Sequence, residues 1–160
     1  MTSEKPGLTH VDAAGHARMV DVSAKAVTVR EATARGRVLC SPAVVEALRG
    51  EGVPKGDALA VARLAGIQAA KRTPDLVPLA HPVAVHAVSV DVDVADFGVE
   101  ITATVRTADR TGVEMEALTC VAVAGLAMVD MVKALDRAAR ITDVRVVAKS
   151  GGRSGDWRGE

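Results

Sequence analysis

An uncharged stretch of thirteen residues, Ala117 to Val129, constrains the fold of this chain more than any other feature of its sequence. Its side chains are apolar or small around the whole circumference of a helix, and a helix of that kind is buried on more than one side. A single sheet covers only one side, so we expect a second protomer to cover another. The stretch is also well short of the ~20 residues that a helix needs to span a bilayer. The sequence therefore predicts an oligomer with closely packed, Ala- and Gly-rich helices and no membrane partner.

The composition argues against several other classes of protein. The 160 residues include 20 basic and 20 acidic ones, and the pI of about 6.9 is not that of a nucleic-acid-binding domain. Phe97 and Trp157 are the only Phe, Tyr or Trp residues, so a base-stacking surface is excluded. Cys40 and Cys120 stand alone, which predicts no metal site. The first residues lack the apolar core of a secretory signal, so we expect a cytoplasmic protein.

Hydrophobic periodicity and turn residues predict the order strand, helices, strand, strand, long helix, strand. Ser41 followed by Pro42 is a good helix start. Asp57 is placed to cap a second helix, which ends at Thr73 because that residue precedes a proline. Val residues that alternate with Ser and Asp predict a half-buried strand. The expected elements are a strand over 27–39, helices over 42–49 and 58–72, a hairpin of strands 88–94 and 99–105, a helix from 113 to about 139 and a strand over 144–148.

This order, βαββαβ, is the ferredoxin-like plait of the α+β class. Its helices would lie on one face of a four-stranded antiparallel sheet. The sequence shows no internal repeat and no linker, so we expect residues 1–160 to form a single domain. Residues 1–19 are expected to be a mobile lead-in and residues 150–160 a flexible, Gly-rich tail.

Lysine is rare among the basic residues, which comprise 14 Arg and only six Lys. Lysine is a compact charge whose pKa shifts readily on burial, so it can transfer a proton where arginine cannot. The lysines could therefore mark places where chemistry needs an ammonium group, although a scatter of solvated lysines explains the numbers as well. They are Lys5, Lys25, Lys55, Lys71, Lys133 and Lys149.

Charged residues lie at both ends of the apolar stretch. Asp130 and Lys133 share a helix face, either as a surface ion pair or as an acid–base pair at the edge of a buried site. At the other end, Glu114 and Glu116 point to one side if their segment is extended. If it is helical, Glu116 and Asp130 are ~21 Å apart, too far for one small reacting centre. The alternative to a catalytic role is that Glu114 and Glu116 only complement the positive end of the helix dipole.

Two further segments could carry chemistry. His81 lies between Pro78 and Pro82 in a stiff loop, which suits a side chain that must be held in place, although a solvated loop histidine is the simpler account. The Gly-rich run over 150–155 could cradle phosphate with its backbone N–H groups. It lacks the P-loop pattern, and a flexible tail explains it equally.

Seven blocks of sequence, in order over about residues 8–156, together resemble one family. They are MVDVSAK (19–25), KGD (55–57), AGIQAAKRT (65–73), LVPLAHP (76–82), TGVEMEALT (111–119), DMVK (130–133) and AKSGGRSGD (148–156). The family is molybdenum cofactor biosynthesis protein C (MoaC), the cyclic pyranopterin monophosphate synthases. One departure is Ala80, where the family more often has Cys, so a thiol at this position is not an obligatory nucleophile.

The resemblance implies a lyase of molybdenum cofactor (molybdopterin) biosynthesis. This enzyme converts 3′,8-cyclo-7,8-dihydro-GTP to cyclic pyranopterin monophosphate and releases pyrophosphate. The resemblance also implies a homohexamer, a trimer of dimers with active sites at the dimer interfaces. It implies no cofactor, with Mg²⁺ left open as a companion of the substrate triphosphate. The alternative is a non-catalytic, oligomeric ligand-sensing module, because ferredoxin-like folds often serve in that way.

Matched residue by residue, the resemblance assigns acid–base work to Asp130 and Lys133, with Lys55 as a further catalytic lysine. Cations facing the triphosphate would favour departure of pyrophosphate. Because Lys55 lies in an early loop, we expect it to come from one protomer and Asp130 from the other. The implied substrate-binding residues are Leu79, Ala80, His81, Glu114, Met115 and Glu116, with Arg30, Lys71 and Lys149 as the cations.

Overall fold

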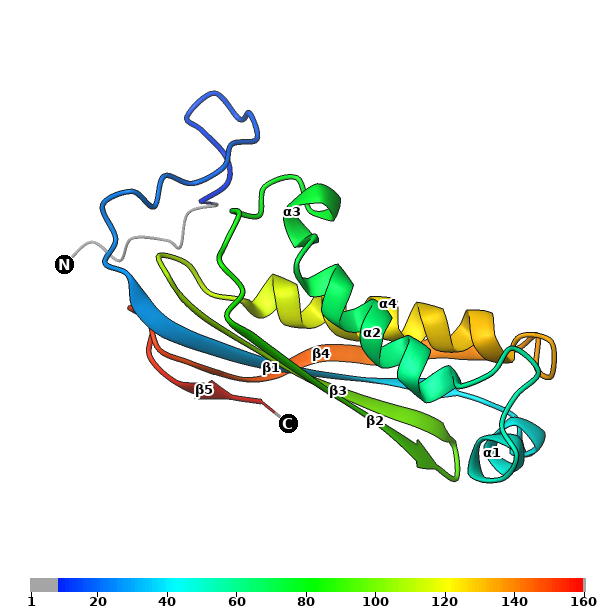
Figure 1. Ribbon diagram of the computed structural model, residues 1–160. Coiled ribbons are helices and arrows are strands. Elements are labelled where there is room, and N and C mark those ends of the chain that lie inside the picture. Colours follow the sequence, from blue (N-terminus) through cyan, green and yellow to red (C-terminus); the bar gives the residue numbers. More distant parts are fainter. Residues whose placement is uncertain (1–8, 160) are drawn as a thin grey trace.

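The structure, a computed structural model, describes residues 9–159 of the chain. Residues 1–8 of the expected lead-in and Glu160 of the expected tail lie outside the described residues. The described part is an α+β fold (Figure 1). Its elements are β1 (Thr28–Leu39), α1 (Pro42–Arg49), α2 (Ala58–Ala70), α3 (Thr73–Leu76), β2 (Ala87–Ala95), β3 (Gly98–Asp109), α4 (Glu114–Val132), β4 (Arg140–Ser150) and β5 (Trp157–Arg158).

The strands form one antiparallel sheet in the order β2-β3-β1-β4-β5, and the first four have the order of a ferredoxin-like plait. The predicted fold is therefore confirmed, with one correction to the strand count. A fifth strand, β5, pairs with β4 through Lys149 and Trp157. The sequence pattern does not predict β5, because a strand of two residues is too short to show a period.

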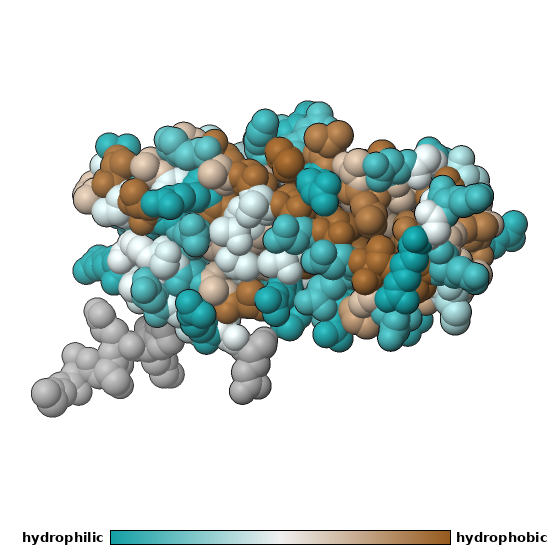
Figure 2. All heavy atoms as spheres, turned by 60° about the horizontal axis from the view of Figure 1, so that its bottom comes forward, coloured by the Kyte–Doolittle hydropathy of each residue, from teal (hydrophilic) through white to brown (hydrophobic). Residues whose placement is uncertain are grey.

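The two faces of the sheet differ as the Val alternation predicted. Helices α2 and α4 cover one face (Figure 1), where Val90 and Val92 are buried. On the same strand Ser89, Asp91 and Asp93 are exposed. Figure 2, which turns the lower side of the molecule forward, shows hydrophilic and hydrophobic side chains intermixed on that side.

Side-chain caps start two of the helices where the sequence predicts them. The Ser41 side chain accepts a hydrogen bond from the backbone N–H of Val44, and α1 begins at Pro42. The Asp57 carboxylate accepts one from the N–H of Ala60 and starts α2. These caps satisfy backbone donors that have no partner within the helix.

Two helices end earlier than expected. Helix α2 ends at Ala70 rather than 72, and the hydroxyl of the buried Thr73 donates to the Ala70 carbonyl as the single turn α3 begins. Helix α4 ends at Val132 rather than near 139. There the Asp136 carboxylate accepts hydrogen bonds from the N–H groups of Ser41 (2.7 Å) and Ala138 (2.9 Å). Such bonds offer the backbone an alternative to the helix, and β4 starts at 140 rather than 144.

Helix α4 is covered on some sides and open on another. It packs on α2, where a Cβ added to Gly66 would lie 3.0 Å from the carbonyl oxygen of Cys120. On the open side the side chain of Leu126 is 60% exposed. By length and composition alone α4 could cross a membrane, but half of that window is buried, as in the core helix of a soluble protein. The open side is the one for which the sequence predicts a second protomer.

Candidate active site

The predicted site residues form two groups at opposite ends of α4. Glu114 and Glu116 lie in its first turn, and Asp130 lies near its last. The segment is helical, so the extended alternative for the two glutamates is wrong. The helical rise places Glu116 and Asp130 about 21 Å apart along the axis. One chain therefore presents two separate polar groups.

The first group is a cluster of Lys55, Asp130 and Lys133, called here the Lys–Asp–Lys cluster. The Lys55 Nζ lies 3.0 and 3.1 Å from the two carboxylate oxygens of Asp130. The Lys133 Nζ lies 2.7 Å from Oδ1. These hydrogen bonds and the positive charges of the two lysines hold the pKa of Asp130 below its usual range, and the hydrogen bond from Lys133 contributes most.

A tight turn between α1 and α2 brings Lys55 to this cluster. Val53 is buried and bridges to Gly56, whose N–H donates to the Val53 carbonyl at 3.0 Å. Gly56 has a φ of +109°, which other residues rarely adopt. Lys55 thus meets Asp130 within one chain, so the expectation that these two residues come from different protomers is wrong.

The Lys–Asp–Lys cluster is exposed in the single chain. The side chain of Asp130 is 54% exposed, so in the single chain the cluster is a half-exposed ion-pair group. Asp130 and Lys133 border a shallow hollow of about 490 Å³ on the open side of α4. Its other lining residues, all apolar, are Val123, Leu126, Ala127 and Val129.

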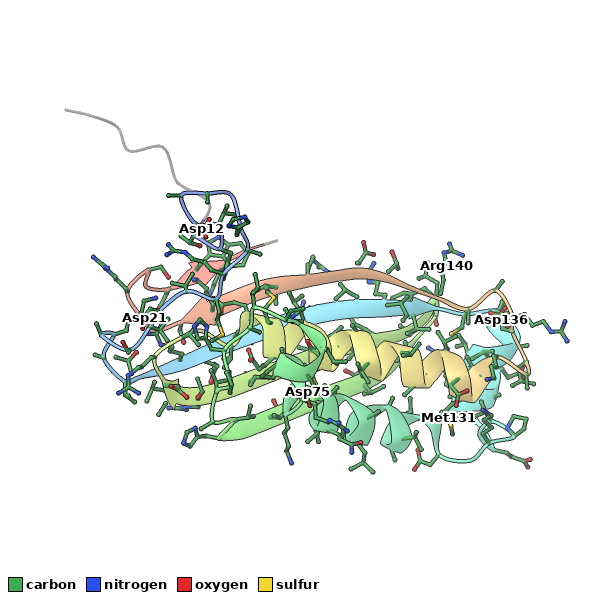
Figure 3. The ribbon with its side chains drawn as sticks, turned by 90° about the horizontal axis from the view of Figure 1, so that it is seen from above. Asp12, Asp21, Asp75, Met131, Asp136 and Arg140 are labelled. Carbon is green, nitrogen blue, oxygen red and sulfur yellow. The ribbon has the colours of Figure 1, made fainter. Side chains whose placement is uncertain are left out.

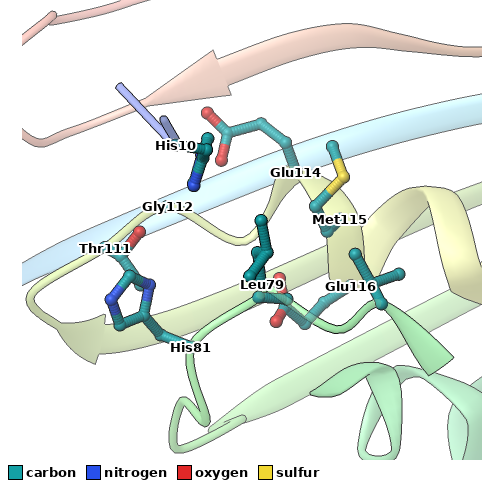
Figure 4. A pocket seen from close by; sticks show the side chains of 10 residues that line it. His10, Leu79, His81, Thr111, Gly112, Glu114, Met115 and Glu116 are labelled. Carbon is teal, nitrogen blue, oxygen red and sulfur yellow. The ribbon is translucent and has the colours of Figure 1, made fainter. Parts of the chain in front are cut away.

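The second group surrounds a cavity of about 570 Å³ at the N-terminal end of α4, called here the large cavity (Figure 4). That volume falls in the usual range for small-molecule sites. All six residues that the resemblance implies for substrate binding line it. The lining consists of His10, Val77, Leu79, Ala80, His81, Thr111, Gly112, Glu114, Met115 and Glu116.

Glu116 is the buried titratable group of the large cavity. It is only 3% exposed, and burial, with a smaller contribution from the negative charge of Glu114, raises its pKa to about 7. A carboxyl group with a pKa near neutrality can hold or release a proton under physiological conditions. This combination of a cavity and a perturbed acid is typical of functional sites.

His81 is held in place, as the flanking prolines predict. It is partly buried, and its Nε2 donates to the carbonyl oxygen of Val20. The solvated alternative is therefore wrong. The backbone N–H of Ser23, and to a smaller degree the proximity of His81, lower the pKa of Asp21.

A smaller cavity of about 210 Å³ adjoins the large one and is called here the cationic cavity. Arg30 and Lys149 line it, so the structure brings these two predicted cations together. Lys71 lines neither cavity and is exposed at the C-terminal end of α2. The cationic cavity is lined by Lys25, Arg30, Glu31, Thr111, Gly112, Glu114, Lys149, Ser150, Gly151 and Ser154.

Hydrogen bonds order the cations of this cavity. The Lys149 Nζ lies 3.1 Å from Glu114 Oε1 and 2.9 Å from the hydroxyl of Ser154. The Arg30 Nε donates to the Asp109 carbonyl at 3.1 Å, and a Cβ on Gly152 would lie 2.2 Å from an Arg30 nitrogen. The Arg30 side chain can move away from such an atom, whereas Gly151 must lack a side chain, because its φ is +80° and an added Cβ would lie 2.1 Å from the Val29 carbonyl oxygen.

Nine residues that line the two cavities were absent from the predicted site, and two of them, Lys25 and His10, have basic side chains. Lys25 could have been found, because it is one of the six lysines and ends the first of the seven resemblance blocks. His10 carried no signal, since it lies in the expected lead-in. Among residues 9–159, no group of three or more His, Cys, Asp or Glu side chains is arranged to hold a metal ion.

The fold and the two groups together describe an α+β protein with two adjoining cavities at the N-terminal end of α4 and the Lys–Asp–Lys cluster near its C-terminal end. Residues 19–152 match the model of the MoaC family, and the chain belongs to that family. The family predicted from the seven blocks is confirmed.

Similar proteins of known name support the same conclusion. A Streptomyces coelicolor protein is 71% identical over 150 residues, 94% of this chain and 88% of its own. A Nocardioides protein is 64% identical over 160 residues and 98% of each chain. A Chloroflexus aggregans protein is 56% identical over 155 residues, 96% of this chain and 94% of its own. Each is named cyclic pyranopterin monophosphate synthase, which confirms the predicted enzyme class over the sensing module.

Proposed function

We propose that the protein converts 3′,8-cyclo-7,8-dihydro-GTP to cyclic pyranopterin monophosphate and releases pyrophosphate, in the cytoplasm. One observation carries the proposal. All six residues implied for substrate binding line one cavity, and two implied phosphate-binding cations line its neighbour. The ring system would occupy the large cavity and the triphosphate the cationic cavity. No resident cofactor is proposed, and any Mg²⁺ would arrive with the triphosphate.

The cationic cavity supplies the charge that this reaction needs. A cyclic monophosphate forms when a sugar-derived hydroxyl oxygen bonds to the α-phosphorus and the bond to the pyrophosphate oxygen breaks. Arg30, Lys149 and Lys25 would stabilise the charge that develops on the leaving pyrophosphate. We retain Lys71 as a further cation because of the resemblance, reaching the ligand from another protomer.

The Lys–Asp–Lys cluster would perform the proton transfers that open one ring and close another. The lowered pKa keeps Asp130 ionised at neutral pH. It is therefore a weak base whose negative charge orients the ammonium groups of Lys55 and Lys133, which would give and take the protons. Glu116, with its pKa of about 7, would exchange a proton at the other end of the ligand.

The two groups would meet in an oligomer. About 21 Å of helix separates them within a chain, and apolar side chains such as Leu126 surround the Lys–Asp–Lys cluster on the open side of α4. A second protomer seated there would bury this side and bring its own large cavity to the cluster. We propose that such dimers form the active sites and assemble three at a time into a homohexamer.

The direct test incubates the purified protein with the cyclic dihydro-GTP intermediate and measures pyrophosphate. The expected result is stoichiometric pyrophosphate and cyclic pyranopterin monophosphate from the wild type. Asp130→Asn should release little. Asp75→Asn, at an exposed aspartate that forms an ion pair with Arg72, is the matched control and should behave as the wild type. No release by a folded wild-type protein would contradict the proposed function.

A further inference from the structure

The segment that precedes β1 forms a turn and pairs with itself. In the segment over residues 9–20, Val11 and Ala17 form an antiparallel bridge. The backbone N–H of Arg18 donates to the carbonyl of His10 at 2.8 Å. These bonds fix the direction in which His10 leaves the backbone.

One carboxylate holds the turn of this segment. Asp12 Oδ1 accepts hydrogen bonds from the backbone N–H groups of Ala14 and His16, both at 2.9 Å. A side chain that bonds to N–H groups two and four residues ahead stabilises a turn without help from a core. The segment therefore has its own local order although most of its residues are exposed.

The folded segment is attached to the large cavity. His81, which lines that cavity, donates from Nε2 to the carbonyl of Val20. Figure 3 shows Asp12 and Asp21 near the N-terminal end of α4, far from Asp136 at the other end. The segment 9–20 thus belongs to the end of the molecule that holds both cavities.

His10 lies where the two cavities adjoin. It lines the large cavity, and Gly112 and Glu114, which line both cavities, are its neighbours in Figure 4. A ligand with its ring in one cavity and its phosphates in the other would place its sugar-derived part at this junction. An imidazole can donate or accept a hydrogen bond there, as a hydroxyl group requires.

We propose that the segment 9–20 is a wall of the substrate site and that His10 binds the sugar-derived part of the nucleotide at the junction of the cavities. This inference rests on the proposed function. Asp12 is then a positioning residue, because it holds the turn that presents His10. His81 acts on both sides of the wall, since it lines the cavity and holds the segment at Val20.

The first test measures binding of the cyclic dihydro-GTP intermediate, and of GTP as a stable probe, by calorimetry on the full-length protein. One hydrogen bond lost corresponds to an increase of about 3- to 10-fold in Kd. We expect that increase for His10→Ala, with partial recovery in His10→Gln. The matched control is His86→Gln, an exposed histidine outside the segment 9–20 and outside both cavity linings. It should leave Kd unchanged.

The second test separates binding from positioning. Asp12→Asn keeps the Oδ1 acceptor and should bind as the wild type does. Asp12→Ala loses both turn hydrogen bonds and should raise Kd as His10→Ala does, with an unchanged thermal midpoint because the turn is not part of the core. In the double variant of Asp12→Ala and His10→Ala the two effects should not add.

The outcomes distinguish this inference from the proposed function. Normal binding and turnover by the wild type, with no change in Kd for His10→Ala, would overturn this inference alone. Additive effects in the double variant would overturn the positioning role of Asp12. A folded wild type that binds neither the intermediate nor GTP would overturn both the proposed function and the inference.

Discussion

The buried carboxyl group of Glu116 gives the protein a pH-dependent stability that one substitution should remove. Its pKa is about 7 in the folded protein against an ordinary value of 4.5. Below pH 4.5 the group is protonated in both states. As the pH rises, the unfolded chain loses its proton first, so stability falls from about pH 4.5 and continues to fall through pH 7. At 1.36 kcal/mol per pKa unit, the full loss is about 3 kcal/mol.

Glu116→Gln imitates the neutral acid and should abolish this loss. At pH 8 the variant should be more stable than the wild type by up to about 3 kcal/mol, and at pH 4.5 the two should be equal. For a chain of this length, that difference corresponds to a gain of about 6–12 °C in Tm at pH 8. Thermal melts followed by circular dichroism, at one protein concentration, measure it.

The comparison includes its own control. Glu51→Gln replaces an exposed glutamate and should follow the wild type at every pH. Carboxyl groups whose pKa is lowered in the folded protein, such as that of Asp130, make the protein less stable in acid. They act equally on the wild type and the variant, so their contribution cancels in the difference between the two free energies of unfolding. A difference that stays constant with pH, or a variant less stable at pH 8, would show that the Glu116 charge has a partner in the folded protein and would refute the reasoning.

Three further predictions concern the Lys–Asp–Lys cluster and the packing of α2 on α4. Asp130→Asn is nearly isosteric at an exposed position, so it should fold and assemble, as circular dichroism and sizing would show, while kcat falls by roughly 10²–10⁴-fold; a variant that fails to assemble would make the carboxylate structural. Lys55→Arg keeps the charge but cannot release a proton at neutral pH, so turnover should be lost; near-normal turnover would remove Lys55 from the chemistry. Gly66→Val should cost about 1–3 kcal/mol in urea unfolding, because its side chain meets the backbone of Cys120; the exposed Gln68→Val should cost much less, and equal losses would contradict the close approach.

The parts of the fold that the sequence predicts well have local signals. The caps at Ser41 and Asp57 are read directly from residue type, and the hairpin from alternation of Val with polar residues. The C-terminal end of α4 and the start of β4 depend on Asp136, whose carboxylate accepts a hydrogen bond from Ser41, 95 positions away in the sequence. Hydrophobic periodicity does not reveal contacts between residues that are distant in the sequence, so the predicted helix extends beyond the observed end at Val132.

The same difference between local signals and long-range contacts decides how much of the site could be predicted. The resemblance named six of the ten residues that line the large cavity, two of the three cations that line the cationic cavity, and all three members of the Lys–Asp–Lys cluster. Which of them meet was not predictable, because Lys55 reaches Asp130 through a turn that depends on Val53 and Gly56. His10 was missed because its role depends on where a short exposed segment lies, and no hydrophobic pattern records that.

The central claim is that the large cavity of one protomer and the Lys–Asp–Lys cluster of another make one active site. It is tested by mixing Asp130→Asn and Lys149→Ala, each inactive alone, under conditions that exchange subunits. In a two-fold symmetric dimer, half of the randomly mixed dimers carry both chains and each has one intact site, so about a quarter of wild-type activity should return. Asp130→Asn mixed with Lys55→Ala, two changes in the same cluster, should place one damaged residue at every site and recover nothing. Mixed oligomers that are confirmed by mass spectrometry but stay inactive in the first pair would contradict the shared site.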